Sequence, residues 1–420
     1  MQRKHLSMES LLRLVRTHFS TLPTPPGCSI TTTDCLMSGL AVYGLKAPSL
    51  LKFGERLQDE NCKKNIKNLY HIGQIPSDTY LRERLDVIDP QSLRRAFTKV
   101  FAVAQRGKII EPYQYLDNYY LLSLDGSGYF SSHEVSCKHC CVKQSKNGKV
   151  TYYHQAMGAV LVHPDIPHVI PLMPEFIHKH DGASKNDCER NASQRLLHHI
   201  RREHPHLNLM VVEDGLASNE PHLKLLDTLN MRYIIGAKEG DHKFLFDWVR
   251  HGDKTAWTFT EGRTTHTFAF VNGVPLNEAH FDYQVNFLAY TQTDPKGKVT
   301  TWSWVTNFTI TRHNAYAIMR GGRARWHVEN QTFNTLKNQG YQFEHNFGHG
   351  YEHLCSTMAV LMFLIFLIDQ IQMLACASFQ AAKKRLGSYI SLWEEMRVAI
   401  RYFIFESWEA LFCRITYNPP

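Results

Sequence analysis

The sequence predicts an α/β protein with a mixed sheet and flanking helices, interrupted by an antiparallel β insertion and bordered by helical N- and C-terminal regions. Two observations support this prediction. Across residues 116–237, short apolar runs and amphipathic stretches follow the order three strands, helix, strand, helix, strand, which is an α/β layer pattern. Across residues 238–308, aromatic and β-branched residues are separated by Gly- and Pro-containing turns, which favour antiparallel strands.

The composition is that of a folded protein. At 420 residues the chain is long enough for about two to three folding units. Hydrophobic residues make up 43% and charged residues 20%, which excludes a disordered chain. Lys and Arg total 47 against 39 Asp and Glu, a net charge of +8. This excess suits a polyanionic partner such as DNA, and it also suits an ordinary basic protein.

Nothing in the sequence points to a secreted or membrane protein. No apolar core follows the basic residues at the start, and ten cysteines in a chain of this length favour a reducing cytoplasm. The most apolar stretch, residues 359–368, is about half as long as the roughly 20 residues that cross a bilayer. We therefore expect a buried core helix there and no membrane contact.

Residues 1–115 are expected to be helical, with a Pro-rich break at residues 22–27. Asp89 can cap a helix that has Pro90 in its first turn and extends to about Arg106. Basic residues occupy most of this helix outside one stripe. The apolar residues that share the stripe are Leu93, Phe97, Val100, Phe101 and Ala104. Such helices serve for packing or for binding DNA ends, and the sequence leaves both open. A second helical region is expected at residues 377–420.

The predicted α/β core has two parts, residues 116–237 and 309–376. In the first part, the strand at residues 119–124 is expected to stop in a tight turn, Asp125-Gly126-Ser127-Gly128, with residues 129–135 as its hairpin partner. A later strand, residues 207–212, ends at Asp214-Gly215. Asn219 can cap the next helix, which has Pro221 in its first turn. The other expected elements are a strand at residues 152–162, a helix at 186–203 and a strand at 231–237.

The predicted insertion, residues 238–308, contains four strand candidates: residues 255–260, 264–271, 283–291 and 300–310. On the last strand, Trp302 and Trp304 alternate onto one face. Packing beneath the insertion is the ordinary role for such a pair. A helix is expected to resume near Tyr316.

Three carboxylates form the candidate site. Asp125 and Asp214 each end an apolar run, while Glu329 follows the helical spacing of Trp326, Phe333 and Leu336. That spacing places Glu329 on a stripe expected to dock on the sheet. An unpaired buried carboxylate costs several kcal/mol, so we expect either Arg325 or a metal ion to compensate it. Mg²⁺ prefers such hard oxygen ligands, and three converging acids fit a pair of ions that act on a phosphodiester bond.

The three motifs resemble those of the DDE insertion-sequence transposases: Leu124-Asp125-Gly126-Ser127, Val212-Glu213-Asp214-Gly215 and Arg325-Trp326-His327-Val328-Glu329. They are most similar to the branch whose RNase H-like core carries a β-rich insertion between the second Asp and the Glu. In that branch a Tyr typically stands three residues before the Arg, and a Lys seven after the Glu. Here Gly322 and Leu336 occupy those positions, and Lys337 lies one place later.

The resemblance implies a DNA transposase with an RNase H-like core, two Mg²⁺ ions (or Mn²⁺ as a substitute) and Asp125, Asp214 and Glu329 as catalytic metal ligands. It also implies that Arg323, Arg325 and Lys337 contact phosphates of double-stranded DNA, at transposon ends and target, and that Trp302 or Trp304 stacks on a displaced base. A homodimer in a synaptic complex, and a cytoplasmic, nucleoid-associated location, would follow. A metal-dependent nuclease or resolvase, or an inactive DNA-binding relative, remains the alternative.

A separate metal site is suggested by Cys137 and Cys140, whose C-x₂-C spacing forms half of a structural zinc site. No second pair has clean spacing, so His133, His154 and Cys188 are candidate partners through the fold alone. A reduced, partly buried hairpin without zinc is the alternative.

Overall fold

One sheet runs through most of the protein, as seen in the computed structural model, which describes residues 4–179, 181–182 and 185–417. The strands in these residues are β1 (Gln114–Tyr115), β2 (Tyr119–Ser132), β3 (Cys141–Gln144), β4 (Val150–His163), β5 (Ile166–Pro171), β6 (Glu175–Ile177), β7 (Leu209–Glu213), β8 (Arg232–Gly236), β9 (Thr255–Glu261), β10 (Thr264–Pro275), β11 (Gln284–Thr293) and β12 (Val299–Thr306). Their main order is β3-β4-β2-β7-β8-β12-β11-β10-β9. β1 pairs with β2, and β5 and β6 pair with β4.

The centre of the sheet is parallel and its flanks are antiparallel. β7 pairs in parallel with both β2 and β8, whereas the other strand pairs of the described residues are antiparallel. A parallel connection needs a crossover, and α7 (Lys185–Glu203) and α8 (Glu220–Thr228) lie in the segments before β7 and β8. The mixed α/β class expected from the sequence is therefore confirmed.

The expected tight turn after Leu124 is wrong. β2 continues through Asp125-Gly126-Ser127-Gly128 to Ser132, because β4 runs beside it and pairs with it along this stretch, from Leu121↔Val162 to Ser132↔Tyr152. The disturbance that the glycines do produce is a shift of register between Gly128 and Phe130, in keeping with the frequent use of Gly at β-bulges. Residues 129–135 are thus partly the end of the same strand, and the hairpin partner is β4.

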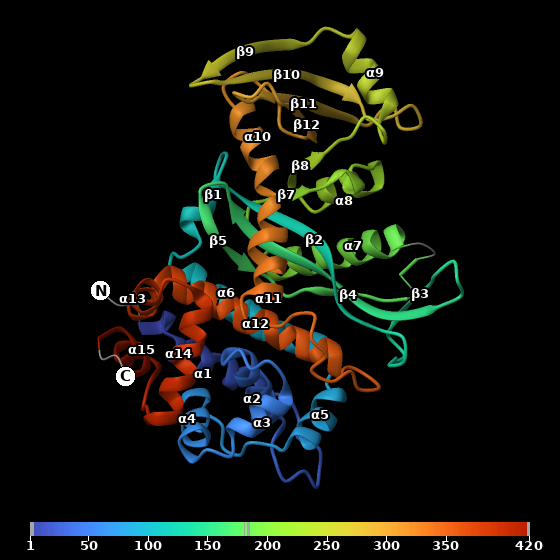
Figure 1. Cartoon of the computed structure of the whole chain (residues 1–420). Helices are drawn as coiled ribbons and strands as arrows, with labels where there is room; N and C mark the ends of the chain where they lie inside the picture. Colours follow the sequence, from blue (N-terminus) through green and yellow to red (C-terminus); the bar gives the residue numbers. More distant parts are fainter. Residues whose placement is uncertain (1–3, 180, 183–184, 418–420) are drawn as a thin grey trace.

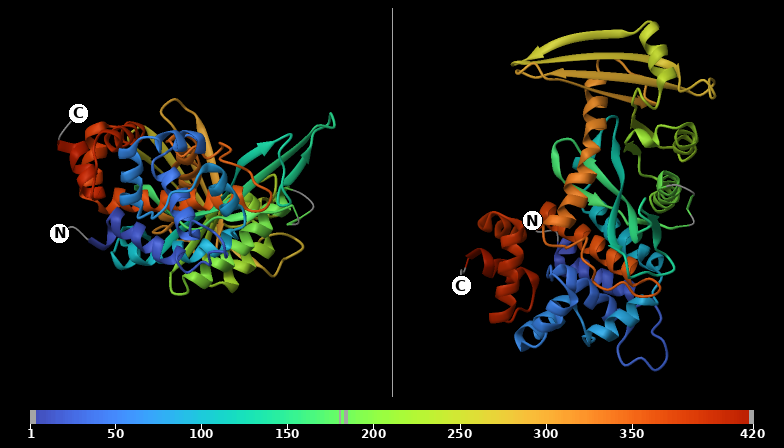
Figure 2. Two further views of the ribbon diagram at one scale, coloured as in Figure 1. Left: turned by 90° about the horizontal axis from the view of Figure 1, so that it is seen from below. Right: turned by 45° about the vertical axis from the view of Figure 1, so that its right-hand side comes forward.

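Helices cover both faces of the central strands. α7 and α8 lie on one face, and α10 (Ala315–Ala324), a π-helical turn (Val328–Phe333) and α11 (Asn334–Asn338) lie across the other (Figures 1 and 2). As expected, Asn219 caps α8 by accepting a hydrogen bond from the His222 amide. The second helical layer packs through α10 on β7 and β8 and through the π-helical turn on β2 and β4.

The segment 238–308 extends the same sheet. β9 to β12 form an antiparallel layer at the top of Figure 1, and β12 pairs with β8 of the central sheet. A helix that the sequence patterns did not predict, α9 (Lys243–His251), precedes these strands. Its buried side chains, Leu245 and Val249, are four residues apart on one helical face. The segment is therefore β-rich with one short helix.

The regions at the two ends of the sequence pack together (Figure 1). The first contains α1 (Met8–Phe19), α2 (Thr32–Gly44), α3 (Leu50–Arg56), α4 (Glu60–Tyr70), α5 (Asp78–Asp86), a 3₁₀ turn (Pro90–Leu93) and α6 (Arg94–Arg106). The second contains α13 (Ala377–Leu386), α14 (Tyr389–Tyr402) and α15 (Trp408–Tyr417). The Asn65 side-chain amide donates to the Ile400 and Phe403 carbonyls, which joins the two regions. Asp89 caps the turn before α6, as expected.

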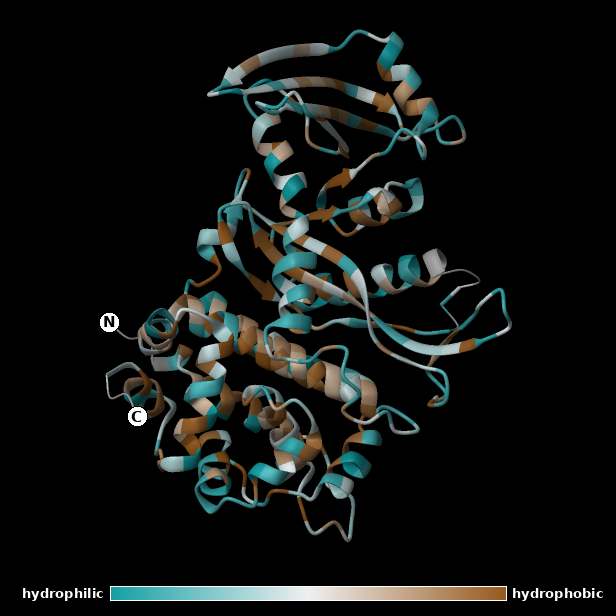
Figure 3. Cartoon of the chain, in the orientation of Figure 1, coloured by the Kyte–Doolittle hydropathy of each residue, from teal (hydrophilic) through white to brown (hydrophobic). Residues whose placement is uncertain are grey.

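α12 (Leu354–Ala375) is the core helix of the helical end. Within the described residues it is the one helix long and apolar enough to cross a membrane. However, 94% of its most apolar stretch of 18 residues is buried inside the protein. It packs on α2, α5 and α6 and on β5 of the sheet. Hydrophobic residues accordingly gather along α12 and the central strands (Figure 3). The expectation of a buried core helix at residues 359–368 is confirmed.

Candidate functional site

Asp125 and Asp214 lie at the same edge of two neighbouring strands, where the parallel pairing of β2 with β7 ends. β2 and β7 are paired in register at Ser123↔Val212, and each aspartate lies two residues beyond that pair. Asp125 is in the middle of a long strand rather than at its end, yet it occupies the position where the parallel pairing stops. Ligand sites of open α/β sheets form at such carboxyl edges. The structure thus brings these two predicted residues side by side.

The electrostatics of Asp125 show that the third carboxylate is also near. Burial and the neighbouring negative charges of Asp214 and Glu329 raise the pKa of Asp125 to about 6. Two contacts oppose this rise: the Gly126 amide donates to Asp125 Oδ1 at 2.8 Å, and Arg325 Nη1 lies 3.6 Å from Oδ2. Asp214 and Glu329 therefore both act on the charge of Asp125, and Arg325 is the countercharge of Asp125.

Glu213 and Asp214 are neighbours in the sequence, but they point to opposite sides because side chains alternate along a strand. Glu213 is buried and accepts hydrogen bonds from His222 Nε2 at 2.7 Å and from the Ser193 hydroxyl at 3.2 Å. Burial disfavours a proton on His222, but the Glu213 carboxylate outweighs it and keeps the pKa of His222 above its usual value. Asp214 points the other way, is exposed, and uses Oδ1 to accept from the Leu216 amide. Asp214 is thus available to a ligand, and Glu213 is not.

The prediction for the Glu329 helix face is wrong in part. Phe333 and Leu336 are buried as expected, but Glu329 is exposed and Trp326 is 63% exposed. The reason is the π-helical turn at Val328–Phe333. A π turn holds more residues than an α turn, so the residues before it rotate relative to those after it. Such turns are frequent at functional sites, and this one leaves the Glu329 carboxylate in solvent near Asp125.

The same turn changes the position of Lys337. In an α-helix, two turns take about seven residues, but a turn with one additional residue brings the eighth residue back to the same side. Lys337, eight residues after Glu329, consequently faces more nearly the same side as Glu329 than the buried Leu336 does. It forms an ion pair with Glu344, whose carboxylate lies 2.8 Å from Lys337 Nζ.

A cleft of about 770 Å³ opens beside Asp214. Of the five predicted DNA-contacting residues, Lys337 does not line it, and four do, together with Trp326 and Lys238: Trp302, Trp304, Arg323 and Arg325. The guanidinium of Arg323 lies over the Trp302 ring, 4.7 Å from its centroid. Trp304 is almost fully buried against Gly322, where an added Cβ would overlap the indole ring. Packing therefore accounts for Trp304, while Trp302 keeps one part of its surface open to the cleft.

Two further residues at this site were not predicted from the sequence. A small cavity of about 70 Å³ lies between Asp125 and Asp214, and Glu189 and Arg190 of α7 line it. A Cβ on Gly126 would lie 3.5 Å from the Glu189 carboxylate. No sequence pattern signals these residues. They come from a helix on the other face of the sheet from Glu329, and only the packing of α7 on the sheet brings them to the site.

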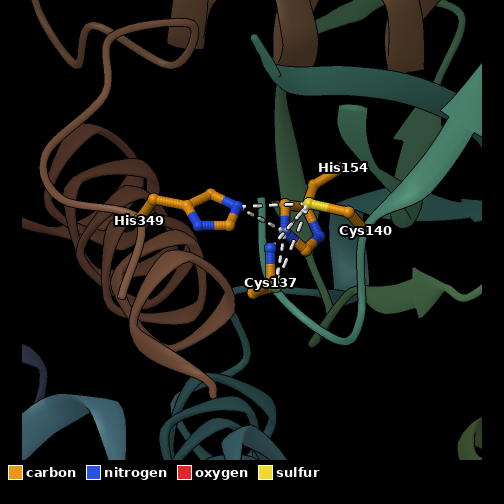
Figure 4. A group of neighbouring side chains, drawn as sticks. All are labelled: Cys137, Cys140, His154 and His349. Carbon is orange, nitrogen blue, oxygen red and sulfur yellow. Dashed lines mark hydrogen bonds between the residues drawn. The ribbon is translucent and has the colours of Figure 1, made fainter. Parts of the chain in front are cut away.

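A second cluster combines Cys137, Cys140, His154 and His349, whose ligand atoms all lie within 4.8 Å of one another (Figure 4). These four donors could hold one metal ion. Burial, and then the neighbouring His349, lowers the pKa of His154 to about 3, so its imidazole is neutral.

The cluster identifies the partners of Cys137 and Cys140. Of the candidates named from the sequence, His154 belongs to the cluster. His133 instead contacts the Val150 carbonyl, and Cys188 contacts the Gly182 carbonyl. His349 was not anticipated, since it lies in the segment between α11 and α12.

Neither the scan against protein-family models nor the search of curated proteins gave a match for this chain.

Proposed function

We propose that this protein is a DNA transposase that cuts and joins phosphodiester bonds at Asp125, Asp214 and Glu329. The observation that carries the proposal is that Asp125 and Asp214 lie at the same edge of paired parallel strands and line one cavity, with Glu329 near enough to act on the charge of Asp125. They come from two parallel strands and from a helix on one face of the sheet. This order of elements, with the β segment between the second Asp and the Glu, supports an RNase H-like core of the DDE type.

The donor set fits two Mg²⁺ ions. Three carboxylates supply the hard oxygen ligands that Mg²⁺ prefers, and solvent and substrate phosphates would complete its shell. The negative charges of Asp214 and Glu329 act on Asp125 in spite of its partner Arg325, and a bound cation would relieve this repulsion. Asp125, Asp214 and Glu329 would hold the ions, and Mn²⁺ could replace Mg²⁺. When bound, the pair would stabilise the charge of an in-line displacement at phosphorus.

The remaining work falls to residues around the cleft. Arg325 is positioned to orient a phosphate next to Asp125, and Arg323 and Lys337 supply further positive charge along the same helical layer. Trp302 offers a ring face for a displaced base, a contact worth about 1–3 kcal/mol when bases stack on aromatic side chains. Positioning and charge stabilisation of this kind carry most of phosphoryl-transfer catalysis.

The partners that follow are double-stranded DNA, as transposon ends and as target, and a second copy of the chain in a synaptic complex. The protein would then be cytoplasmic and associated with the nucleoid. A nuclease or resolvase on the same core would cut without joining, and an inactive relative would bind without cutting.

The test is cleavage of labelled duplexes taken from the DNA that flanks the coding region, in Mg²⁺, with band shifts run in parallel. We expect Asp125→Asn to lose cleavage by roughly 10³-fold or more while binding is kept, because the loss of one member disables a catalytic unit. Binding should depend on phosphate contacts and weaken with salt. Glu278→Gln, the same chemical change at an exposed acid in the insertion, is the matched control.

Each outcome separates the alternatives. Cleavage that survives in Asp125→Asn, Asp214→Asn and Glu329→Gln alike would end the proposal. Cutting without strand transfer by the wild-type protein would favour the nuclease, and binding without cutting would favour the inactive relative.

A further inference from the structure

The Cys/His cluster joins three segments that are far apart in the sequence. Cys137 and Cys140 lie in the loop between β2 and β3, His154 lies on β4, and His349 reaches in from the segment between α11 and α12 (Figure 4). Cys140, His154 and His349 are each at most 5% exposed. The four side chains thus meet in the interior, where thiols and imidazoles need a partner for their polar atoms.

The separations of the donor atoms match a tetrahedral zinc site. Zn–S bonds of about 2.3 Å and Zn–N bonds of about 2.0–2.1 Å at tetrahedral angles place two sulfurs about 3.8 Å apart, a sulfur and a nitrogen about 3.6 Å apart, and two nitrogens about 3.3 Å apart. In the structure, the Cys137 and Cys140 sulfurs are 3.9 Å apart, and each lies 3.4 Å from His154 Nε2. His349 Nε2 lies 3.2 Å from the Cys140 sulfur and 3.1 Å from His154 Nε2.

A disulfide or a set of plain hydrogen bonds fits the cluster less well than a metal ion. A disulfide has sulfurs about 2.0 Å apart, and both cysteines are free. Hydrogen bonds among thiols and imidazoles are weak and would not require four donors to point at one centre. The outer nitrogen of His349 supports a metal, because Nδ1 lies 3.0 Å from the Gly350 carbonyl. Donation to that carbonyl fixes the tautomer that leaves Nε2 free for a metal, as is usual for ligating histidines.

We propose that Cys137, Cys140, His154 and His349 bind one structural Zn²⁺ ion that fastens the segment between α11 and α12 to the β2–β4 hairpin. Two thiolates and two imidazoles in a tetrahedron select zinc among the common divalent ions. All four positions are filled by protein, which is the mark of a structural rather than a catalytic site. The inference does not depend on the proposed transposase activity.

The position of His349 explains what the ion would do. The segment that carries it connects the helical layer of Glu329 to α12. Its far end is already anchored, because the Asp86 carboxylate accepts hydrogen bonds from the amides of residues 351–354. Zinc would anchor the segment at His349, just before these residues. Loss of the ion should therefore loosen the β2–β3 loop and residues 342–350 and leave the central strands intact.

Elemental analysis of untagged protein is the direct test, with one zinc expected per chain. Cys140→Ser and His349→Ala should lower this to less than about a tenth of an equivalent. Cys141→Ser is the matched control: Cys141 is buried next to Cys140, but its sulfur contacts the Ile177 carbonyl, to which a serine can also donate. Zinc-free wild-type protein, or equal zinc in Cys140→Ser and Cys141→Ser, would overturn the assignment.

Two measurements on the wild-type chain avoid variants that fail to fold. Replacement of zinc by Co²⁺ should give the intense visible bands of tetrahedral cobalt with thiolate charge transfer, and octahedral cobalt spectra would refute the proposed ligand set. Chelation should increase hydrogen exchange in residues 133–144 and 342–350 more than in β7 and β8. An equal increase everywhere, or none in these two segments, would contradict the fastening role.

Discussion

A buried ion pair between Lys46 and Asp369 joins the first helical region to α12, and its removal gives the sharpest stability prediction. Lys46 Nζ lies 2.7 Å from Asp369 Oδ2, and the two side chains are 0% and 4% exposed. Asp369 also accepts from the Tyr341 hydroxyl at 2.6 Å, and the Lys46 ammonium lies over the rings of Tyr341 and Trp393 at 4.4 and 4.1 Å. Either charge without the other would be buried and uncompensated.

The expected magnitude follows from this burial. Lys46→Met or Asp369→Leu alone should cost about 3–5 kcal/mol, the usual effect of leaving one buried charge unpaired. Burial lowers the pKa of Lys46 and raises that of Asp369 in spite of their attraction, so desolvation outweighs pairing. The double variant should therefore recover most of the loss. About 1–3 kcal/mol should remain for the unpaired Tyr341 hydroxyl, and Tyr341→Phe should remove that remainder.

The assay is urea denaturation of the single, double and triple variants under one set of conditions, with midpoints and slopes compared. The exposed pair Lys52–Glu55, also 2.7 Å apart, is the control, and Lys52→Met should change stability little. If the double variant loses as much as the two single variants together, the two charges are not energetically coupled, and the reasoning fails.

Three further predictions concern the candidate site. Because the pKa of Asp125 is raised to about 6, cleavage at subsaturating Mg²⁺ should fall about tenfold per pH unit below pH 6, where protonation of the carboxylate removes a ligand; a rate that stays flat to pH 5 would refute this. Gly322→Ala should lower the urea midpoint although Ala favours helices, since the new Cβ overlaps Trp304 and overpacking costs about 1–3 kcal/mol; a raised midpoint would contradict it. Lys337→Ala should reduce the salt dependence of DNA binding by about one phosphate contact, whereas Glu344→Gln should not weaken binding; equal affinity of Lys337→Ala and wild type at every salt concentration would exclude that contact.

Local sequence was sufficient for many elements of the fold. Asp89 with Pro90 marked a helix start, Asn219 marked another, and the apolar runs marked most strands. These features are local, because caps and periodicity depend on residues a few positions apart. The same reasoning identified Asp125 and Asp214 as edge residues, since the end of an apolar run before a polar residue is visible in the sequence.

The tertiary structure decided what depends on distant segments. β2 passes through Asp125 rather than turning there, because β4 supplies hydrogen-bond partners for the whole stretch. Glu329 and Trp326 face solvent because a π turn, which no spacing rule anticipates, rotates the helix. The nearness of Asp214 and Glu329 to Asp125 likewise depends on the pairing of β2 with β7 and on the packing of the helical layer.

The two buried polar centres show the same limit. Cys137 and Cys140 indicated half of a metal site, but His349 completes it from a position 209 residues beyond Cys140, where no spacing rule applies. Asp369 stood in the sequence as the boundary of an apolar stretch, yet it lies inside α12 opposite Lys46. Local hydrogen bonding and periodicity are written in neighbouring residues and can be predicted from them. Ligand sets and buried charge pairs come from chain segments that become neighbours when the core packs, so the sequence supplies their chemistry and the tertiary structure alone supplies their partners.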